Sequence, residues 1–432
     1  MSINNNIRNL LDIQDKNIIF QDNCVTYEEL KGKKCKFIEG TLTTIPTKCL
    51  KCHVPNESST IYKNGTQTSK ITLPMCGIYP TYLLLRKQRY VCKSCHQSFT
   101  LPTELVKKNC FISNQVRSLI SVKLTHAQSI KSIAQDTFVS ETTVQRIINK
   151  LVSMQLPYDM QLPAHLSFDE FKYAKGHMAF QYIDAETGKI LGILDDRYNS
   201  TIINHFSGHY SRTTRNKVKT VTIDMNAGYV SVIKELFPNA KIIIDRFHLV
   251  QLISRSMNKY RIQMMNQLKK SSNDNMKKYR RLKQCWKLLL KNRKDISSVI
   301  YNYYRLFGQR TEEGILDEVL SYSPLLKENY EYYQSLLSAI QARNITLFQS
   351  ILEKDISPNI SNYMKTSIKT LKKHLPYIEN SFIYPYNNGR IEGINNKIKV
   401  LNRIAYGYRN FNHYRKRIII HFLLKPISTM IS

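Results

Sequence analysis

Acidic side chains are scarce in this sequence of 432 residues, in which 32 Asp and Glu stand against 64 Lys and Arg. The formal net charge is +32 at pH 7, and the isoelectric point lies near 9.7. A field of this sign attracts polyanions, of which nucleic acid is the commonest large one, and it repels cationic partners. The composition therefore predicts a nucleic-acid partner.

Long apolar runs are also missing. A membrane-spanning helix needs about 20 apolar residues, and the longest run here, residues 418–424, is short and contains His421. Residues 1–20 lack the charged, apolar and small-residue order of a signal peptide, so we expect a cytoplasmic protein with no membrane partner. Hydrophobic residues make up 42% of the sequence and charged residues 22%, values that exclude global disorder.

Internal repeats and low-complexity linkers are absent as well, but the texture of the sequence changes along the chain. The length equals roughly three typical domains, so we expect a multidomain α/β protein. Seven of the nine cysteines fall in the first 105 residues, among short β-branched and aromatic runs such as 81–85 and 88–91. The expected domains are an N-terminal strand-and-loop domain at 1–105, a helical domain at 106–155, the first part of an α/β core at 160–248, an all-helical segment at 249–380 and a C-terminal helical part of the core at 381–432.

Two C-x-x-C pairs stand in the N-terminal domain. Each pair places two thiolates on one tight turn, called a zinc knuckle, and two knuckles together supply the four thiolates of a tetrahedral structural Zn²⁺ site. In a zinc ribbon, the knuckles lie at the ends of hairpins. The spacing between the pairs exceeds the usual interval of about 15–20 residues, and His53 or His96 remains an alternative ligand. Four buried cysteines without metal are the simpler alternative; a disulfide framework fits an odd number of cysteines poorly. The expected zinc ligands are Cys49, Cys52, Cys92 and Cys95.

Residues 130–147 have the pattern of a helix-turn-helix. Ser140 is a suitable N-cap for the second helix, although Phe138 stands where such a turn commonly has glycine. An ordinary pair of helices fits this stretch equally well, but the net charge favours DNA binding. The second helix would present exposed side chains to base edges or phosphates, namely Thr142, Thr143, Gln145 and Arg146.

Carboxylates follow the strand-like runs of the α/β core. A strand from residue 165 leads to Asp169 and Glu170, a hairpin spans 178–194, a strand at 218–223 leads to Asp224, and a strand at 241–244 leads to Asp245. The expected elements follow one another as three strands, a helix, a strand, a helix and a strand. This is the element order of the ribonuclease-H-like fold, in which acids of the first and fourth strands lie side by side. Adjacent side chains on a strand face opposite ways, so only one of Asp169 and Glu170 can point at such a site.

Glu392 is the single acid between residues 380 and 432, among nine Lys and Arg. At ~100° per residue, an apolar stripe from Ile391 to Leu401 lies opposite the face that carries Glu392. Clustered carboxylates bind Mg²⁺, and nearby cations bind a nucleic-acid backbone. The alternative for Glu392 is a surface ion pair with Arg390 or Lys399. The candidate DNA contacts on this helix are Arg390, Asn395, Asn396, Lys399 and Arg403.

Together these features resemble the ISL-three group of bacterial insertion-sequence transposases. The resemblance is carried, from about Cys49 to His421, by the C-x-x-C pairs, the helix-turn-helix and four further motifs, which are 168–171 (FDEF), 223–225 (IDM), 245–248 (DRFH) and 389–399 (GRIEGINNKIK).

The resemblance implies a transposase of the DDE type, with Asp169, Asp224 and Glu392 as catalytic acids that bind Mg²⁺ or Mn²⁺, two ions per site. It implies a helical insertion between Asp224 and Glu392, with Asp245 and His248 in a supporting or structural role. The implied partners are double-stranded DNA, as terminal inverted repeats and target DNA, and further copies of the chain in a dimer or larger synaptic complex.

Two rival functions remain at this point. A nuclease of the same fold would cleave DNA without joining it, and a DNA-binding regulator would carry a decayed catalytic core. Trp286, the only tryptophan, is expected in the core of the helical segment, with stacking on an extruded base as the alternative.

Overall fold

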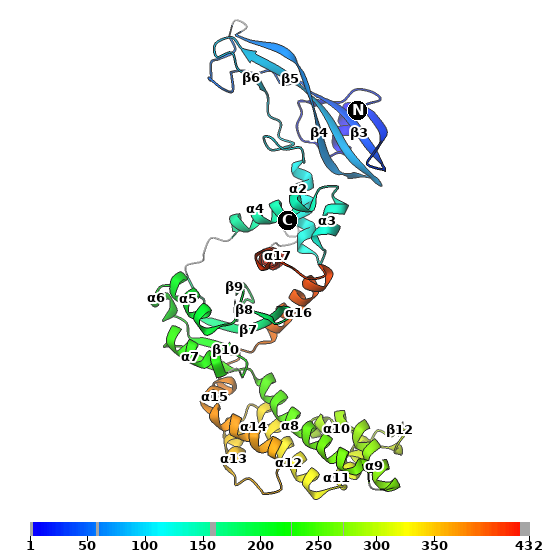
Figure 1. The fold of residues 1–432 in the computed structure, drawn as a ribbon, viewed down its shortest axis with the longest axis vertical. Coiled ribbons are helices and arrows are strands. Elements are labelled where there is room, and N and C mark those ends of the chain that lie inside the picture. Colours follow the sequence, from blue (N-terminus) through cyan, green and yellow to red (C-terminus); the bar gives the residue numbers. More distant parts are fainter. Residues whose placement is uncertain (1–2, 58–59, 156–160, 226, 271, 424–432) are drawn as a thin grey trace. The chain divides into compact units, whose positions relative to one another are not determined.

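The computed structural model describes residues 3–57, 60–155, 161–225, 227–270 and 272–423. The chain divides into two compact units (Figure 1). The first comprises Met1–Pro157 and Ile398–Ser432, and the second comprises Tyr158–Lys397. Among the described helices, none is long and apolar enough to cross a membrane.

A six-stranded sheet forms the N-terminal part of the first unit, preceded by helix α1 (Ile3–Leu10). Its path is β1-β3-β5-β4, with β2 added to β3 and β6 added to β5. The short strands expected at 81–85 and 88–91 are one long strand, because Arg86 and Lys87 continue the pairing with β4. The strands are β1 (Ile18–Ile19), β2 (Val25–Leu30), β3 (Lys33–Leu42), β4 (Ile61–Cys76), β5 (Tyr79–Cys92) and β6 (Ser98–Thr100).

Four helices complete the first unit: α2 (Asn114–Thr125), α3 (Ile130–Asp136), α4 (Glu141–Gln155) and α17 (Phe411–Leu423). They share one apolar core, to which α17 contributes Ile419 and Ile420. Between α3 and α4, Phe138 adopts a left-handed backbone with φ of 54°, the conformation that glycine usually provides in such a turn. Ser140 then caps α4, because its Oγ accepts a hydrogen bond from Thr143 N at 3.2 Å.

Arg417 anchors α17 to the end of α2. The side chain is fully buried, and its guanidinium donates hydrogen bonds to the carbonyl oxygens of Leu124, His126 and Gln128. These carbonyls lie at and beyond the C-terminus of α2, where backbone acceptors lack partners within the helix. A cation at this end also complements the helix dipole.

A five-stranded sheet begins the second unit, in the order β11-β10-β7-β8-β9. Strands β11, β10 and β7 are parallel, and β8 and β9 continue the sheet as antiparallel strands. Phe168, Tyr182 and Phe206 lie in its core. The elements are β7 (His165–Ala174), β8 (His177–Asp184), β9 (Ile190–Leu194), α5 (Asn199–His209), α6 (Arg212–Arg215), β10 (Thr220–Ile223), α7 (Ala227–Leu236) and β11 (Lys241–Ile244).

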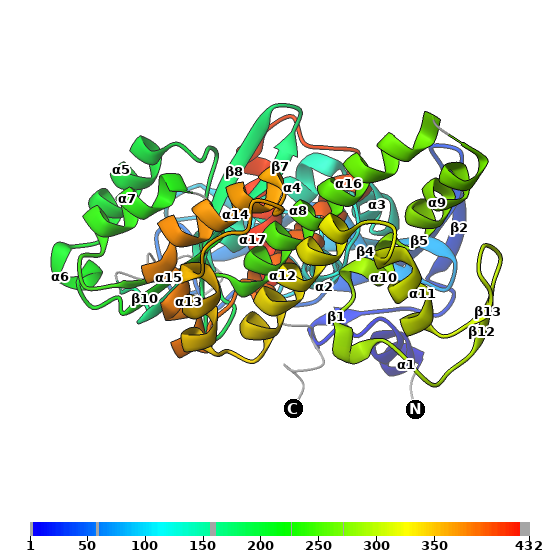
Figure 2. The same cartoon turned by 90° about the horizontal axis from the view of Figure 1, so that it is seen from below.

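A helical region with a core of its own follows the sheet. Helices α12 and α14 pack along α8 (Figures 1 and 2). The expectation of an all-helical segment is wrong in one place, because 302–310 forms a two-stranded hairpin. The elements are α8 (Arg246–Gln267), η1 (Leu268–Lys270), α9 (Asn273–Gln284), α10 (Trp286–Leu290), η2 (Arg293–Asp295), β12 (Asn302–Tyr304), β13 (Gly308–Arg310), α11 (Glu312–Leu320), α12 (Pro324–Gln341), α13 (Ile345–Glu353), α14 (Asn362–Lys373) and α15 (Leu375–Ile383).

Helix α16 (Gly389–Ile404) carries Glu392. Its apolar stripe is buried as the sequence predicts, with Ile391 and Ile398 fully covered. Residues 389–397 belong to the second unit, and the rest of the helix belongs to the first. Within the first unit, Tyr414 Oη of α17 donates to Ile398 O at 2.9 Å.

Candidate functional site

Asp169 lies on β7, and Asp224 directly follows the end of the neighbouring parallel strand β10. Ser167 of β7 pairs with Thr222 of β10, and each aspartate comes two residues later in the sequence, Asp169 within β7 and Asp224 just beyond β10. Side chains two residues apart share a face of the sheet, so both carboxylates lie on the same face, where the pairing of these two strands ends. Glu170 is excluded from this face because it is the next residue on β7.

The Asp169 carboxylate is held by two donors. Its Oδ1 accepts from the backbone N of Glu170 at 2.7 Å, and its Oδ2 accepts from Asn395 Nδ2 at 2.7 Å. Burial desolvates the carboxylate and raises its pKa to about 6, although the Glu170 N–H acts in the opposite direction.

The three predicted acids are close enough to influence one another electrostatically. The negative charges of Asp224 and Glu392 both raise the pKa of Asp169, whereas His248 lowers it. Carboxylates gathered in this way repel one another unless a cation or protons neutralise them. The acids that influence one another in this way come from three separate parts of the sequence, but the group of possible metal ligands that closes around Glu392 contains Asp245 and His248 rather than Asp169 and Asp224.

Glu392 projects from the first turn of α16, and its side chain is 38% exposed. Its Oε1 lies 3.9 Å from His248 Nε2. Ligand atoms of Asp245, His248 and Glu392 all lie within 4.8 Å of one another. Asp245 is buried and caps α8, because its Oδ1 accepts from Phe247 N at 3.3 Å, so this acid has a structural role in the fold.

Asn395 requires a correction. The sequence pattern places it among exposed DNA contacts, but its side chain is only 6% exposed. Its Nδ2 donates to Asp169, and its Oδ1 accepts from Gln181 Nε2 at 2.6 Å. The amide thus joins α16 to β7 and β8 and orients the Asp169 carboxylate.

Gln181 is a site residue that sequence reasoning missed. It lies on β8 opposite Asp169 and is fully buried among apolar neighbours. The available signal was an uncharged polar residue inside an apolar strand between Phe180 and Tyr182, because a buried amide needs a specific partner.

The other acids near the site have different partners. Glu170 accepts hydrogen bonds from Tyr229 Oη at 2.6 Å and from the Arg197 guanidinium at 2.5 Å. Asp196 accepts from Tyr198 N and Thr201 Oγ1 at the start of α5. Both acids therefore have hydrogen-bond partners other than the predicted catalytic acids.

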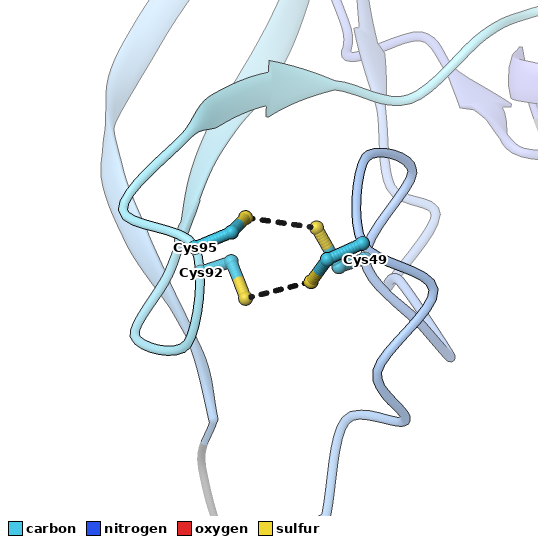
Figure 3. Close-up of side chains that lie close together, drawn as sticks. Cys49, Cys92 and Cys95 are labelled. Atoms are coloured by element: carbon cyan, nitrogen blue, oxygen red, sulfur yellow. Dashed lines mark hydrogen bonds between the residues drawn. The ribbon is translucent and has the colours of Figure 1, made fainter.

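A second cluster lies in the first unit, where four thiols converge (Figure 3). The Sγ atoms of Cys49 and Cys95 lie 3.7 Å apart, as do those of Cys52 and Cys92. All four sulfur atoms are within 4.8 Å of one another. Tetrahedral Zn²⁺ with Zn–S bonds of about 2.3 Å requires sulfur separations near 3.8 Å, so the donor set fits a Cys₄ zinc site.

The two knuckles repeat one backbone conformation. His53 N donates to Cys49 O at 3.1 Å, and His96 N donates to Cys92 O at 2.9 Å. His53 and His96 both have left-handed φ values, of 62° and 53°. The histidines therefore close the knuckle turns, and the thiol cluster forms without them.

Backbone N–H groups also affect the thiols. The N–H of Cys95 holds the pKa of Cys92 at about 6. At Cys52, the N–H of Val54 lowers the pKa, but desolvation and the neighbouring thiols outweigh it and raise the pKa to about 12. Four thiolates this close together would repel one another, and a bound cation would balance their charges.

The second helix of the helix-turn-helix presents a smaller exposed face than its sequence predicts. Thr142 and Arg146 are exposed and Gln145 is partly exposed, but Thr143 is only 8% exposed. Its hydroxyl lies 3.0 Å from Ser140 Oγ and accepts from Arg146 at 3.3 Å, so Thr143 serves the helix cap. On α16, the predicted contacts other than Asn395 are exposed: Arg390, Asn396, Lys399 and Arg403.

Comparison with known proteins identifies the family of the chain. The family model of DDE transposases of the ISL3 (ISL-three) type, described as transposase, matches residues 166–418, which is more than half of the chain. The chain therefore belongs to the ISL-three family of insertion-sequence transposases.

Two relatives share segments with the chain. It is 29% identical over 265 residues to the transposase for insertion sequence element IS1001 of Bordetella parapertussis, covering 59% of this chain and 60% of that protein. It is 38% identical over 120 residues to a protein of Lactococcus lactis subsp. lactis described as an ATP-dependent protease, covering 28% of this chain and 38% of that protein. The chain thus spans less than two thirds of the length of either relative.

Proposed function

We propose that this protein is a metal-dependent DNA transposase that cleaves phosphodiester bonds at the ends of its own insertion sequence and joins the freed 3′-hydroxyls to target DNA. The observation that carries the proposal is the match to the ISL-three family, in a chain where Asp224 and Glu392 both act electrostatically on the partly buried Asp169. The strand order supports a ribonuclease-H-like core, in which the first and fourth strands are neighbours, as β7 and β10 are here.

The donor set fits hard divalent cations. Asp169, Asp224 and Glu392 offer only carboxylate oxygens, which suit Mg²⁺ and Mn²⁺ better than softer metals. Two such ions, when bound, activate the attacking oxygen and stabilise the leaving oxygen of a phosphodiester.

The protein's own groups orient the acids. The Glu170 N–H and the Asn395 amide fix both oxygens of Asp169, so that little reorganisation is needed when metal and substrate bind. His248 Nε2 lies 3.9 Å from Glu392 Oε1, close enough to restrict the position of that carboxylate. Cations on the exposed face of α16, such as Arg390, bind DNA phosphates.

End recognition belongs to the first unit in this proposal. The Cys₄ cluster holds one structural Zn²⁺, and α4 contacts the terminal inverted repeats through Thr142, Gln145 and Arg146. Joining two element ends to one target requires a dimer or larger synaptic complex. The protein acts in the bacterial cytoplasm and associates with the nucleoid when it binds DNA.

Other functions explain fewer of these observations. A regulator with a decayed core has no need of a partly buried, hydrogen-bonded Asp169 on which two further acids act electrostatically. A nuclease would yield nicked DNA without joined product. An ATP-dependent enzyme commonly uses the phosphate-binding pattern G-x-x-x-x-G-K-[ST], and this sequence contains none.

The test is a cleavage and joining assay on DNA that carries the element ends, with Mg²⁺ present. Asp169→Asn, Asp224→Asn and Glu392→Gln each remove a charge with little change of shape. We expect both cleavage and joined product to fall by at least 10³-fold, on the order found when a whole catalytic interaction is lost, while DNA binding persists.

The matched control is Asp195→Asn, since Asp195 is exposed beyond β9 and lies outside the cluster. It should cleave like the unmodified protein. Near-normal cutting by Glu392→Gln would show that Glu392 is only a surface acid. Cleavage without joined product would establish the nuclease instead.

A further inference from the structure

Trp286 lines an open cavity in the helical region of the second unit, although the sequence places it in a core. Its side chain is 42% exposed, at the start of α10. The cavity has a volume of about 690 Å³, ample for a nucleobase with its sugar. The lining is mainly apolar and aromatic, and includes Trp286, Leu288, Leu290, Tyr304 and Phe307.

The aromatic rings at this cavity are accompanied by cations. Lys287 Nζ lies 5.7 Å from the centroid of the Trp286 ring, and the Arg281 guanidinium lies 4.9 Å from that of Phe307. On the neighbouring hairpin β12–β13, Tyr303 is 80% exposed. An apolar lining that combines stacking rings with adjacent cations is typical of sites that bind single-stranded nucleic acid.

The surrounding segment is strongly basic. Residues 268–310 contain thirteen Lys and Arg against two acids, Asp274 and Asp295. Many of these cations are exposed, among them Lys277, Arg280, Lys283, Lys287 and Arg305. Such a surface attracts phosphates and repels a basic peptide, so charge complementarity favours a polyanion as the occupant.

The one carboxylate in the lining does not oppose this charge. Glu312 is paired with Lys291 at 2.6 Å and accepts from Ser297 N at 3.1 Å. Its charge is compensated locally, and its oxygens, like the amide of the exposed Gln284, supply hydrogen-bonding groups for the edge of a base.

We propose that this cavity binds an unpaired nucleobase of a DNA strand, which stacks on Trp286 while the exposed cations hold the adjoining phosphates. The inference rests on the proposed function for the identity of the polymer as DNA. Double-stranded DNA needs only the cations, because its bases are already stacked within the duplex. The aromatic lining therefore adds a preference for DNA with a base outside the helix.

Trp286 is the only tryptophan of the chain, so fluorescence excited selectively in tryptophan, and not in the tyrosines, reports on this site alone. The full-length protein is titrated with a short duplex that has an unpaired 3′ overhang, with a blunt duplex of equal length, and with the same overhang made abasic. We expect saturable quenching by the overhang, and little by the blunt or abasic DNA. Equal quenching by all three would overturn the proposal and identify a phosphate-binding surface.

Variants separate stacking from folding. Trp286→Ala should weaken binding of the overhang roughly 5- to 150-fold, the range for loss of one stacked base, without changing affinity for the blunt duplex. Trp286→Phe should bind the overhang nearly as tightly as the unmodified protein does, because phenylalanine can also stack on a base. The matched control is Tyr363→Ala, because Tyr363 is 40% exposed with Lys259 Nζ 5.8 Å from its ring but does not line the cavity.

Unchanged affinity of Trp286→Ala for the overhang would also contradict the proposal. Failure here is distinguishable from failure of the proposed function. A protein that binds and cleaves blunt element ends without preferring the overhang would leave the transposase assignment intact. A protein that binds no DNA at all would contradict both.

Discussion

The Asn395 amide lies between the first acid of the site and a buried glutamine of the next strand. Helical periodicity correctly places Asn395 on the face of α16 that carries Glu392, but it cannot tell which part of that face meets the sheet. The deciding contacts come from Asp169 and Gln181, more than 200 positions away in the sequence. Long-range hydrogen bonds of this kind leave no local pattern, and only a buried polar residue hints at them.

Asn395→Ala should raise the Mg²⁺ concentration needed for half-maximal cleavage. The variant removes the donor that orients Asp169 Oδ2, so the carboxylate must be ordered when the metal binds. Loss of one hydrogen bond to a charged group is worth about 1.5–3 kcal/mol, equivalent to roughly 10- to 150-fold. The measurement is cleavage rate against Mg²⁺ concentration.

Asn396→Ala provides the comparison, because Asn396 is the exposed neighbour on the same helix. It should leave the Mg²⁺ midpoint unchanged, whatever its effect on DNA affinity. If Asn395→Ala lowers cleavage at every Mg²⁺ concentration without moving the midpoint, the residue only stabilises the fold.

Asp169 also predicts a pH-dependent stability in buffers without added divalent metal. Its folded-state pKa is raised to about 6, above the ordinary aspartate value, so the ionised side chain opposes folding. Stability from this group is present near pH 4 and is lost as the pH rises through 6. Asp169→Asn should therefore stabilise the metal-free protein at pH 8 by roughly 1–3 kcal/mol, with little effect near pH 4.

Urea unfolding at both pH values, followed by Trp286 fluorescence, measures this difference in the second unit. Equal effects of Asp169→Asn at pH 4 and pH 8 would show that the carboxylate has an ordinary pKa in the folded protein.

At the scale of the elements, alternation and periodicity predict most of the second unit. The hairpin at 178–194 and the strands before Asp224 and Asp245 are confirmed because each is a short apolar run bounded by turn residues. The long strands β4 and β5 are not predicted, since they contain charged residues that remain paired in the sheet. The left-handed backbone at Phe138 is likewise not predicted, because a φ of 54° is uncommon for a bulky residue.

The two zinc knuckles lead to a prediction about metal removal. Four thiolates that converge from separate loops should bind one Zn²⁺, and its binding energy should stabilise this part of the first unit. Cys92→Ser should lose the metal and lower the thermal midpoint of the N-terminal sheet. Elemental analysis of the purified protein, with calorimetry, tests both points.

Cys110→Ser serves as the control, because Cys110 lies outside the thiol cluster. It should retain one zinc ion per chain and the same midpoint. The prediction fails if the unmodified protein is purified without zinc and has the same stability as Cys92→Ser. The thiols would then be packed together without binding a metal.

For the whole molecule, the sequence predicts the class of partner better than the placement of single contacts. Net charge is a sum over all residues and does not depend on the fold, whereas the exposure of Thr143 or Trp286 depends on packing. The order of the motifs identifies the family, and the family match confirms it. A cation that touches phosphate contributes to affinity for any DNA, whereas a side chain that contacts a base edge contributes to sequence preference.

Salt dependence separates these two kinds of contact. If a chain of net charge +32 binds DNA by displacing counterions, log affinity should fall linearly with log salt concentration, with a slope of about −0.9 for each phosphate neutralised. Arg146→Ala should reduce the magnitude of this slope by about 1 if Arg146 contacts a phosphate. Thr142→Ala should keep the slope but relax the preference for element ends over unrelated DNA.

The control is Lys175→Ala, because Lys175 is an exposed cation in the β7–β8 turn. This variant should change neither the slope nor the preference for element ends. Affinity that stays constant between low and moderate salt would show that the charge of this protein does not drive its binding to DNA.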